Sequence, residues 1–243
     1  MTIIDKIDKI AVVSLKNPPG NCLTAPDFMD KKTLEAFLTQ NKIKALIIKG
    51  AGKHFSAGAE VSAIYKQVAA QTLASKITKG KELLKSIYDL NIPVIAAIEG
   101  VCFGGGLEIA LSAHIRIVSQ KALLAFPESI HQLMPGLGGT CKLKNFVTLG
   151  KSIEILLQGN TLNAEKALEL GLADYICNPG KSYETAVALA ENLTKGNSMM
   201  LINNVMKALK NAYEMPLHKA LEKETLLFCE LASVQAMKKN NKE

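Results

Sequence analysis

Short apolar segments rich in β-branched residues alternate with segments of helical spacing over roughly the first 140 residues. KIAVVSL (Lys9–Leu15) and KALIIKG (Lys44–Gly50) predict strands, because short apolar runs rich in Val and Ile suit a buried sheet. Between them, Ala25–Gln40 repeats its apolar residues at the helical period and predicts a helix. Three more strands are predicted at Ile92–Gly100, His114–Ser119 and Ala122–Phe126. This alternation predicts an α/β body.

From Thr140 onward the pattern is almost entirely helical. NAEKALELG (Asn163–Gly171) begins with a good N-cap residue and closes with a glycine. Turn residues at Asn178–Ser182 and Thr194–Ser198 are the candidate junctions, so we divide the chain into a body of residues 1–190 and a helical region of residues 191–243. The last helical segments carry wide apolar faces, which predict an interface between subunits.

Composition and cysteine usage restrict the class of protein. Hydrophobic residues make up 48% and charged residues 21%, which is typical of a soluble globular chain. No apolar run approaches the roughly 20 residues that span a membrane, and the start of the chain lacks the apolar core of a secretion signal. The five cysteines are scattered without a C-x-x-C pair. We therefore expect free thiols in a reducing cytoplasm, with no membrane partner and no disulfide framework.

The charge and the local motifs exclude several kinds of site. A net charge of +7 favours anionic partners, but the lysines are dispersed and there is no Trp, so nucleic acid is not the expected ligand. KGAGKH lacks the spacing of a phosphate loop, and HFSAG lacks the first glycine of a nucleophile elbow. FGGGLE spaces its glycines differently from a dinucleotide fingerprint, and the four histidines show no metal-ligand spacing.

Three stretches carry the candidate chemistry: His54–Ile64, Gly100–Ala113 and Ala122–Thr140. The first two place small residues at a strand-to-helix turn, where backbone N–H groups are left uncovered and a ligand can approach closely. Two such turns can direct two N–H donors at one oxygen, as an oxyanion hole requires. Glutamates in the second and third stretches could act as acid and base.

In order and spacing, several motifs resemble those of the crotonase superfamily, the enoyl-CoA hydratase/isomerase family. They are VSLKNPPGNCLT, HFSAGAE, IPVIAAIEGVCFGGGLEIAL, FPESIHQLMPGLGGTCKL and TLNAEKALELGLADYI. The resemblance covers nearly the whole chain. It implies a crotonase-like ββα spiral core and a C-terminal helical trimerisation region. It also implies thioester substrates, a homotrimer or dimer of trimers, no metal, and coenzyme A only as part of the substrate.

The same resemblance assigns roles to individual residues. It implies an oxyanion hole formed by the backbone N–H groups of Ala57 and Gly105, and it implies that Glu108 and Glu128 are the catalytic pair, at the hydratase spacing. The thioester would lie along Ala57, Gly58, Ala59, Glu60, Gly104 and Gly105. From the residues alone, the glycines could serve tight packing, Glu108 could lie on a helix surface, and Glu128 could be an ordinary acid of a first helical turn.

Several residues depart from the family pattern, so more than one substrate and activity stay open. Glu60 stands where the family has Asp and should cap the next helix less well, while His114, His54 and Cys102 are expected to be structural. The sequence ends before the family's last segment, which commonly covers the adenine of CoA. The substrate is therefore either an acyl-CoA or a carrier-protein thioester. A family isomerase, decarboxylase or dehydratase of fatty acid metabolism or polyketide biosynthesis, and a non-catalytic binding protein, remain the alternatives to a hydratase.

Overall fold

Two β-sheets of unequal size organise the protein, which the computed structural model describes over residues 2–240. The larger sheet has the order β1 (Thr2–Ile7), β2 (Ile10–Leu15), β3 (Ala45–Gly50), β4 (Val94–Ile98), β6 (Ile115–Ser119) and β9 (Tyr175–Cys177). The smaller contains β5 (Val101–Phe103), β7 (Leu123–Ala125) and β8 (Leu162–Asn163). Only the pairs β1–β2 and β7–β8 are antiparallel within the described strands. The predicted strands all form, each within its expected range.

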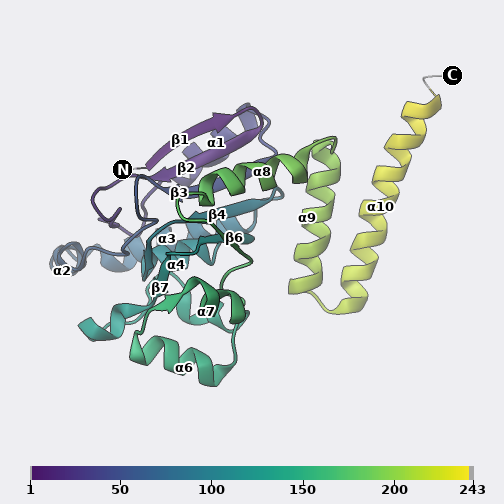
Figure 1. The fold of residues 1–243 in the computed structure, drawn as a ribbon. Coiled ribbons are helices and arrows are strands. Elements are labelled where there is room, and N and C mark those ends of the chain that lie inside the picture. The colour runs from purple at the N-terminus through teal and green to yellow at the C-terminus, as the bar shows by residue number, and fades with distance from the viewer. Residues whose placement is uncertain (1, 241–243) are drawn as a thin grey trace.

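The chain winds as a spiral in which a strand of the larger sheet leads into the smaller layer and then into a helix (Figure 1). β4 continues into β5 and then into α4 (Gly105–Ala110), and β6 continues into β7 and then into the 3-10 helix η1 (Pro127–His131). Isolated bridges Ser56–Cys102 and Leu23–Ala59 extend the smaller layer to the earlier turns. This arrangement confirms the crotonase-like ββα spiral and places the loop ends of successive turns beside one another.

Seven further helices lie in the described part of the body, and three of them begin at a side-chain cap. The seven are α1 (Lys31–Gln40), α2 (Val61–Ala69), α3 (Leu73–Tyr88), α5 (Gly139–Leu143), α6 (Leu149–Gln158), α7 (Ala164–Glu169) and α8 (Ser182–Thr194). The Asp30 carboxylate accepts the Thr33 N–H at 2.8 Å, so α1 begins at Lys31 and not at Ala25, where the spacing predicted it. The Asn163 side chain accepts the Lys166 N–H at 2.9 Å, which confirms that predicted cap.

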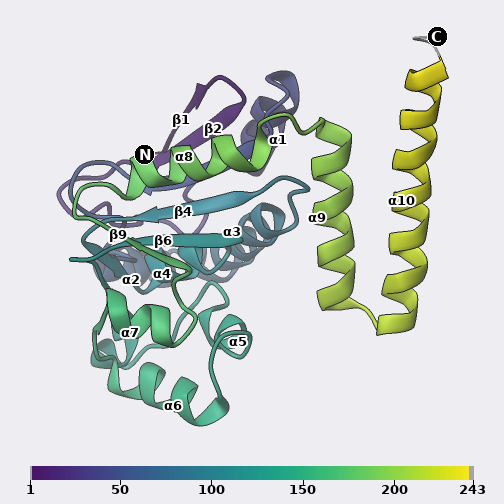
Figure 2. The same ribbon diagram turned by 45° about the vertical axis from the view of Figure 1, so that its right-hand side comes forward.

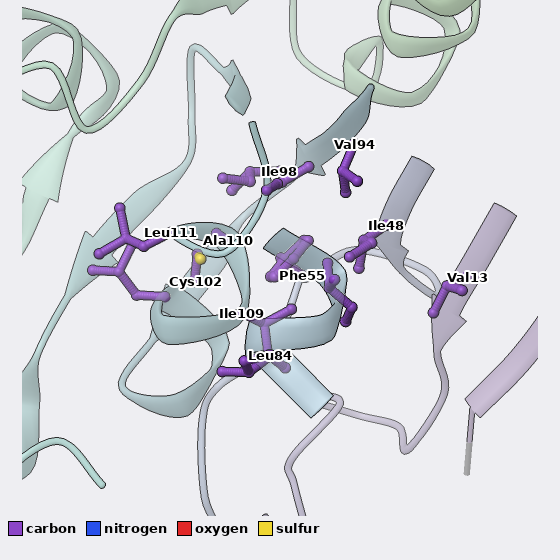
Figure 3. Packing of buried hydrophobic residues seen from close by; sticks show 14 of the residues in the cluster. Val13, Ile48, Phe55, Leu84, Val94, Ile98, Cys102, Ile109, Ala110 and Leu111 are labelled. Carbon is purple, nitrogen blue, oxygen red and sulfur yellow. The ribbon is translucent and has the colours of Figure 1, made fainter. Parts of the chain in front are cut away.

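The main core lies between the larger sheet and the helices beneath it. Val13, Ile48 and Val94 point from β2, β3 and β4 toward Ile109 of α4 and Leu84 of α3 (Figure 3). The opposite face of the sheet is covered by α8, whose alanines pack in a second, smaller cluster (Figure 2). Burial on both faces explains why the central strands read as continuous apolar runs. It also makes the sheet a rigid support for the turns at its ends.

Helices α9 (Met199–Glu214) and α10 (Leu217–Asn240) form a hairpin in which α9 packs against the body through the buried Ile202, while α10 stands away from it (Figures 1 and 2). Lys210 of α9 pairs with Asp89 at 2.6 Å, and the Asn204 amide donates to Glu230 of α10 at 2.9 Å. Large apolar side chains on the hairpin are exposed: Leu201, Val205, Leu209, Tyr213, Met215, Leu217, Leu221, Leu226, Phe228 and Met237. The helical C-terminal region is thus confirmed, whereas the division at residues 190 and 191 and the trimerisation stay predictions.

Candidate active site

Two small-residue turns pack directly on each other at the ends of β3 and β5. Gly58 has φ +89°, and a Cβ there would lie 2.7 Å from the Phe103 carbonyl oxygen and 3.4 Å from the Gly105 nitrogen. A Cβ on Gly105 would in turn lie 3.9 Å from the Ala59 nitrogen. The 2.7 Å distance and the positive φ require a glycine at position 58. Within residues 2–240, neither the Ala59 N–H nor the Gly105 N–H has an acceptor, so the turns bring two unused donors together.

The first turn corrects one residue of the predicted oxyanion hole. The Ala57 N–H donates to the Gly20 carbonyl oxygen at 2.8 Å and is not available to a ligand. At Ala59 the hydrogen bonds to Leu23 are made by the flanking residues: the Leu23 N–H donates to the Gly58 carbonyl, and the Glu60 N–H donates to the Leu23 carbonyl. That bridge leaves the Ala59 N–H free. The structure therefore favours Ala59 over Ala57 as the donor opposite Gly105.

Glu108 is buried on α4, with 1% of its surface exposed. Its Oε1 accepts the backbone N–H of Leu137 at 2.6 Å and that of Gly139 at 2.7 Å. Gly139 must be a glycine, because a Cβ there would lie 2.8 Å from the Phe126 ring. The alternative of a surface carboxylate is thereby excluded for Glu108. Short N–H bonds to a carboxylate are of the charge-assisted kind.

Glu128 approaches from η1, where Pro127 occupies the first turn. A Cβ on Gly104, which has φ +48°, would lie 2.8 Å from the Glu128 Oε1. The carboxyl group therefore lies directly against the glycine turn that precedes α4. Its Oε2 is buried without a hydrogen-bond partner among the described residues. A half-buried carboxyl with an unsatisfied oxygen is unlike an ordinary acid of a first helical turn, which faces water.

The surroundings of the two carboxyls set their acidity. Burial, together with the smaller effect of the neighbouring Glu108 charge, raises the pKa of Glu128 to about 7. Burial also raises the pKa of Glu108, but the Gly139 and Leu137 N–H groups and the Lys142 ammonium act against that rise. The two carboxyls therefore compete for one proton near neutral pH. The N–H pair favours negative charge on Glu108, and the unpartnered oxygen favours the proton on Glu128.

The other singled-out residues have structural surroundings. His54 Nδ1 accepts the Val101 N–H at 3.1 Å, and the His114 ring bonds the backbone of Val94 and Tyr88 at 3.0 and 2.9 Å. Cys102 is fully buried, and burial raises the pKa of its thiol. Glu60 makes no side-chain cap to α2 and instead accepts the Ser62 hydroxyl at 2.6 Å, as its extra methylene led us to expect.

Asn21 and Ser56 support the first turn, and the sequence reasoning gave them no role. The Asn21 amide donates to the Ala51 and His54 carbonyls at 2.9 and 2.7 Å. The buried Ser56 hydroxyl donates to the Asn21 carbonyl at 2.8 Å and accepts the Gly58 N–H at 3.2 Å. The signal for Asn21 was the second Asn of NPPGN, which lies in a motif that was noticed but given no mechanism.

The described part of the chain offers neither a metal cluster nor a membrane-spanning helix. No group of three or more His, Cys, Asp or Glu side chains among residues 2–240 is arranged to hold a metal ion. None of the helices in that range combines the length and the hydropathy that crossing a membrane requires.

Comparison with known proteins identifies the family. The model of the family "Enoyl-CoA hydratase/isomerase" matches residues 5–243. The chain belongs to this family. A Bacillus subtilis (strain 168) protein named "Probable enoyl-CoA hydratase" is 34% identical over 164 residues, which are 67% of this chain and 64% of that protein. The Arabidopsis thaliana peroxisomal fatty acid beta-oxidation multifunctional protein AIM1 is 31% identical over 196 residues, which are 80% of this chain.

The family's solved structures share the fold. The crystal structure of an enoyl-CoA hydratase from Bacillus anthracis superimposes with a TM-score of 0.81 at 27% identity. The match covers 98% of this chain and 96% of that one. By contrast, the aligned regions span only 64% of the Bacillus subtilis protein and 27% of AIM1. Membership in the family and the fold are therefore established, and the activity has to be argued from the site.

Proposed function

We propose that the protein is an enoyl-CoA hydratase, which reversibly adds water across the C2=C3 double bond of an acyl thioester. One observation carries this proposal. The Glu128 carboxyl lies against Gly104, the charge of the buried Glu108 acts on it, and the neighbouring Gly105 and Ala59 N–H groups have no acceptor within the described residues. Water addition to an enoyl thioester needs a base for the water, an acid for C2 and donors for the thioester oxygen.

The thioester carbonyl would accept the Ala59 and Gly105 N–H groups. When water adds to C3, the π electrons of the C2=C3 bond move toward C2 and the carbonyl oxygen, and an enolate-like state forms. Donors that are already in place stabilise that charge, and losing one typically costs about 100- to 1000-fold in rate. The N–H pair supports this role because neither donor has an acceptor within the described residues, and Gly105 is buried, where a donor without a partner is costly.

The two glutamates divide the proton chemistry. Glu108, whose Oε1 accepts two N–H bonds, is the base: it takes a proton from water as the oxygen bonds to C3. Glu128, whose pKa is raised to about 7, is the acid: it gives its proton to C2 as the enolate collapses. The proton then passes from Glu108 back to Glu128 before the next turnover. Dehydration follows the same steps in reverse.

Substrate and setting follow from the family and the charge. An acyl-CoA is the proposed substrate, since the relatives carry enoyl-CoA hydratase names and a chain of net charge +7 suits a polyanionic carrier. Coenzyme A enters only as part of that substrate. The five cysteines are free, which fits a reducing, cytoplasmic setting. The exposed apolar hairpin supports a homotrimer or dimer of trimers.

Glutamate variants test the proposal directly. Turnover of crotonyl-CoA is followed by the loss of the enoyl thioester absorbance, and the product is identified by mass and stereochemistry. We expect Glu108→Gln and Glu128→Gln each to lower kcat by at least about 100-fold. Glu165→Gln, which changes an exposed carboxylate on α7 away from these turns, serves as the control and should retain activity. An isomerised or decarboxylated product would assign a different family activity, and full turnover by either variant would refute that residue's role.

A further inference from the structure

Helix α5 holds Glu108 at two points. At the start of the helix, the Gly139 N–H bonds the Glu108 carboxylate at 2.7 Å. In its last turn, Lys142 reaches back to α4, where its Nζ hydrogen-bonds the Ser112 hydroxyl and lies 3.5 Å from the Glu108 carbonyl oxygen. The Ser112 hydroxyl itself donates to that carbonyl at 2.8 Å. One short helix thus contacts both the side chain and the backbone of the same catalytic residue.

The Lys142 ammonium has few other contacts. It is partly buried, and within residues 2–240 it makes no ion pair. Burial lowers the pKa of Lys142 to about 8, and the Glu108 charge acts against this fall. A partly buried amine that forms no salt bridge is costly for the fold. Such a cost is expected where the charge serves a neighbouring group.

We propose that Lys142 is a positioning residue for the hydration reaction, because its ammonium group holds α5 against α4 and keeps the Glu108 carboxyl in its charged, water-activating form. This inference rests on the proposed function, since it takes Glu108 to be the base. Without the cation, the proton would move more readily onto Glu108. The Leu137 and Gly139 N–H bonds would then lose their charge-assisted character, and the carboxyl would lose both its basicity and its orientation.

Three titratable groups act on Glu108 from the elements around it. Lys142 comes from α5, Lys81 from α3 and Glu128 from η1. The exposed Lys81 is screened by water and salt, whereas the partly buried Lys142 is screened much less. Glu128 acts in the opposite sense when it is ionised, because a like charge favours protonation. Of the two cations, Lys142 therefore has the larger effect on the charge state of Glu108, where it adds to the stronger effect of the Gly139 and Leu137 N–H groups.

Carboxyl titration by NMR tests the inference without any substrate. The probe is the free enzyme with ¹³C-labelled glutamate carboxyls, and the Glu108 signal is assigned by its loss in Glu108→Gln. We expect Lys142→Met to raise the Glu108 pKa by about one unit or more, and Lys142→Arg to leave it near the wild-type value. An unchanged Glu108 titration in Lys142→Met overturns the inference, and so does an equal rise in Lys142→Arg.

A reciprocal titration covers the case in which Lys142→Met does not fold. Coupling between two groups is mutual, so removing the Glu108 charge must act on Lys142. In the Glu108→Gln enzyme, the Lys142 amine should titrate below its wild-type value of about 8. An unchanged Lys142 titration would overturn the inference.

Kinetics separate this inference from the proposed function. In Lys142→Met, the acid limb of kcat for crotonyl-CoA hydration should move to higher pH by the same amount as the Glu108 pKa, with KM little changed, and Lys142→Arg should restore it. If Lys142→Met raises KM but leaves the acid limb of the kcat pH profile unchanged, Lys142 contributes to substrate binding and the inference is overturned. A wild-type enzyme that hydrates no enoyl-CoA would refute the proposed function, while the two titrations would still report the coupling of Lys142 to Glu108.

Discussion

Gly104 and Glu128 lie so close that a single methyl group on the glycine would stand 2.8 Å from the glutamate Oε1. That distance is shorter than a Cβ tolerates, and the backbone at Gly104 has φ +48°, which disfavours any other residue. The three consecutive glycines of the second turn thus have different tasks. Gly104 leaves room for the Glu128 carboxyl, Gly105 has an N–H without an acceptor among the described residues, and Gly106 packs against Ser56, where a Cβ would lie 2.7 Å from the Ser56 carbonyl oxygen.

A methyl group at Gly104 should therefore displace the Glu128 carboxyl. We expect Gly104→Ala to lower kcat for enoyl-CoA hydration by about 100-fold, as misplacing a catalytic group by about 1 Å can do. Gly52→Ala is the matched control: Gly52 has φ +77°, but a Cβ there meets nothing within 4 Å. The control carries the backbone strain without the collision. Equal losses of kcat in the two variants would show that strain, and not contact with Glu128, is responsible.

The raised pKa of Glu128 predicts the pH dependence of hydration. The acid must carry its proton to supply C2, so kcat/KM for crotonyl-CoA should fall as pH rises above about 7. The Glu108 charge contributes to that raised pKa. In Glu108→Gln the alkaline limb of the residual activity should consequently move to lower pH. A pH profile that stays flat from pH 6 to 9 would exclude Glu128 as the acid.

Local signals predicted the main strands, because buried strands are continuous apolar runs. The spiral and the glutamate pair were predicted from the resemblance to the family, whose motifs are informative through their order and spacing. The short strands β5, β8 and β9 were missed, because two or three residues carry no periodicity of their own. The edge strand β1 was missed because its six residues are partly exposed and include charged side chains, so they form no continuous apolar run. The pairing of these strands comes from the strands beside them, such as Val118 of β6 opposite Ile176 of β9.

The choice of oxyanion donor could not come from local signals. In the first turn, Ala57 and Ala59 are both small and flank Gly58, so the sequence alone does not separate them. The difference arises from a distant segment: Gly20 occupies the Ala57 N–H, and the Leu23 bridge leaves the Ala59 N–H free. The reach of Lys142 back to Glu108 is equally non-local, because GGTCKL does not show where its amine lies.

A bound thioester should distinguish Ala59 from Ala57. Donation by the Ala59 and Gly105 N–H groups weakens the carbonyl bond, so its infrared stretch should move to lower frequency on binding. We expect Ala59→Pro, which removes the donor, to reduce this shift and to lower kcat by about 100- to 1000-fold. Ala59→Gly keeps the N–H and is the control. A crystal structure with the thioester oxygen on the Ala57 nitrogen would contradict the assignment.

The last prediction concerns the α9–α10 hairpin. Leu221 and Phe228 are seven residues apart on α10, so they share a helix face, and both are largely exposed at 51% and 69%. An apolar face of this kind on a helix that stands away from the body is suited to another subunit (Figure 2). We expect light scattering to give a mass of three or six chains for the wild type.

Changing Leu221 and Phe228 together to Ser should reduce that mass to one chain and lower the activity, while circular dichroism shows the body still folded. The control replaces the exposed Glu222 and Lys223 by Ser on the same helix and should assemble normally. If the Leu221 and Phe228 double variant still assembles, the interface must lie on another surface. A wild type with the mass of one chain and full turnover would show that the hairpin folds back on its own subunit. In that case Lys210→Met, which removes the ion pair between α9 and Asp89, should lower the stability of the monomer.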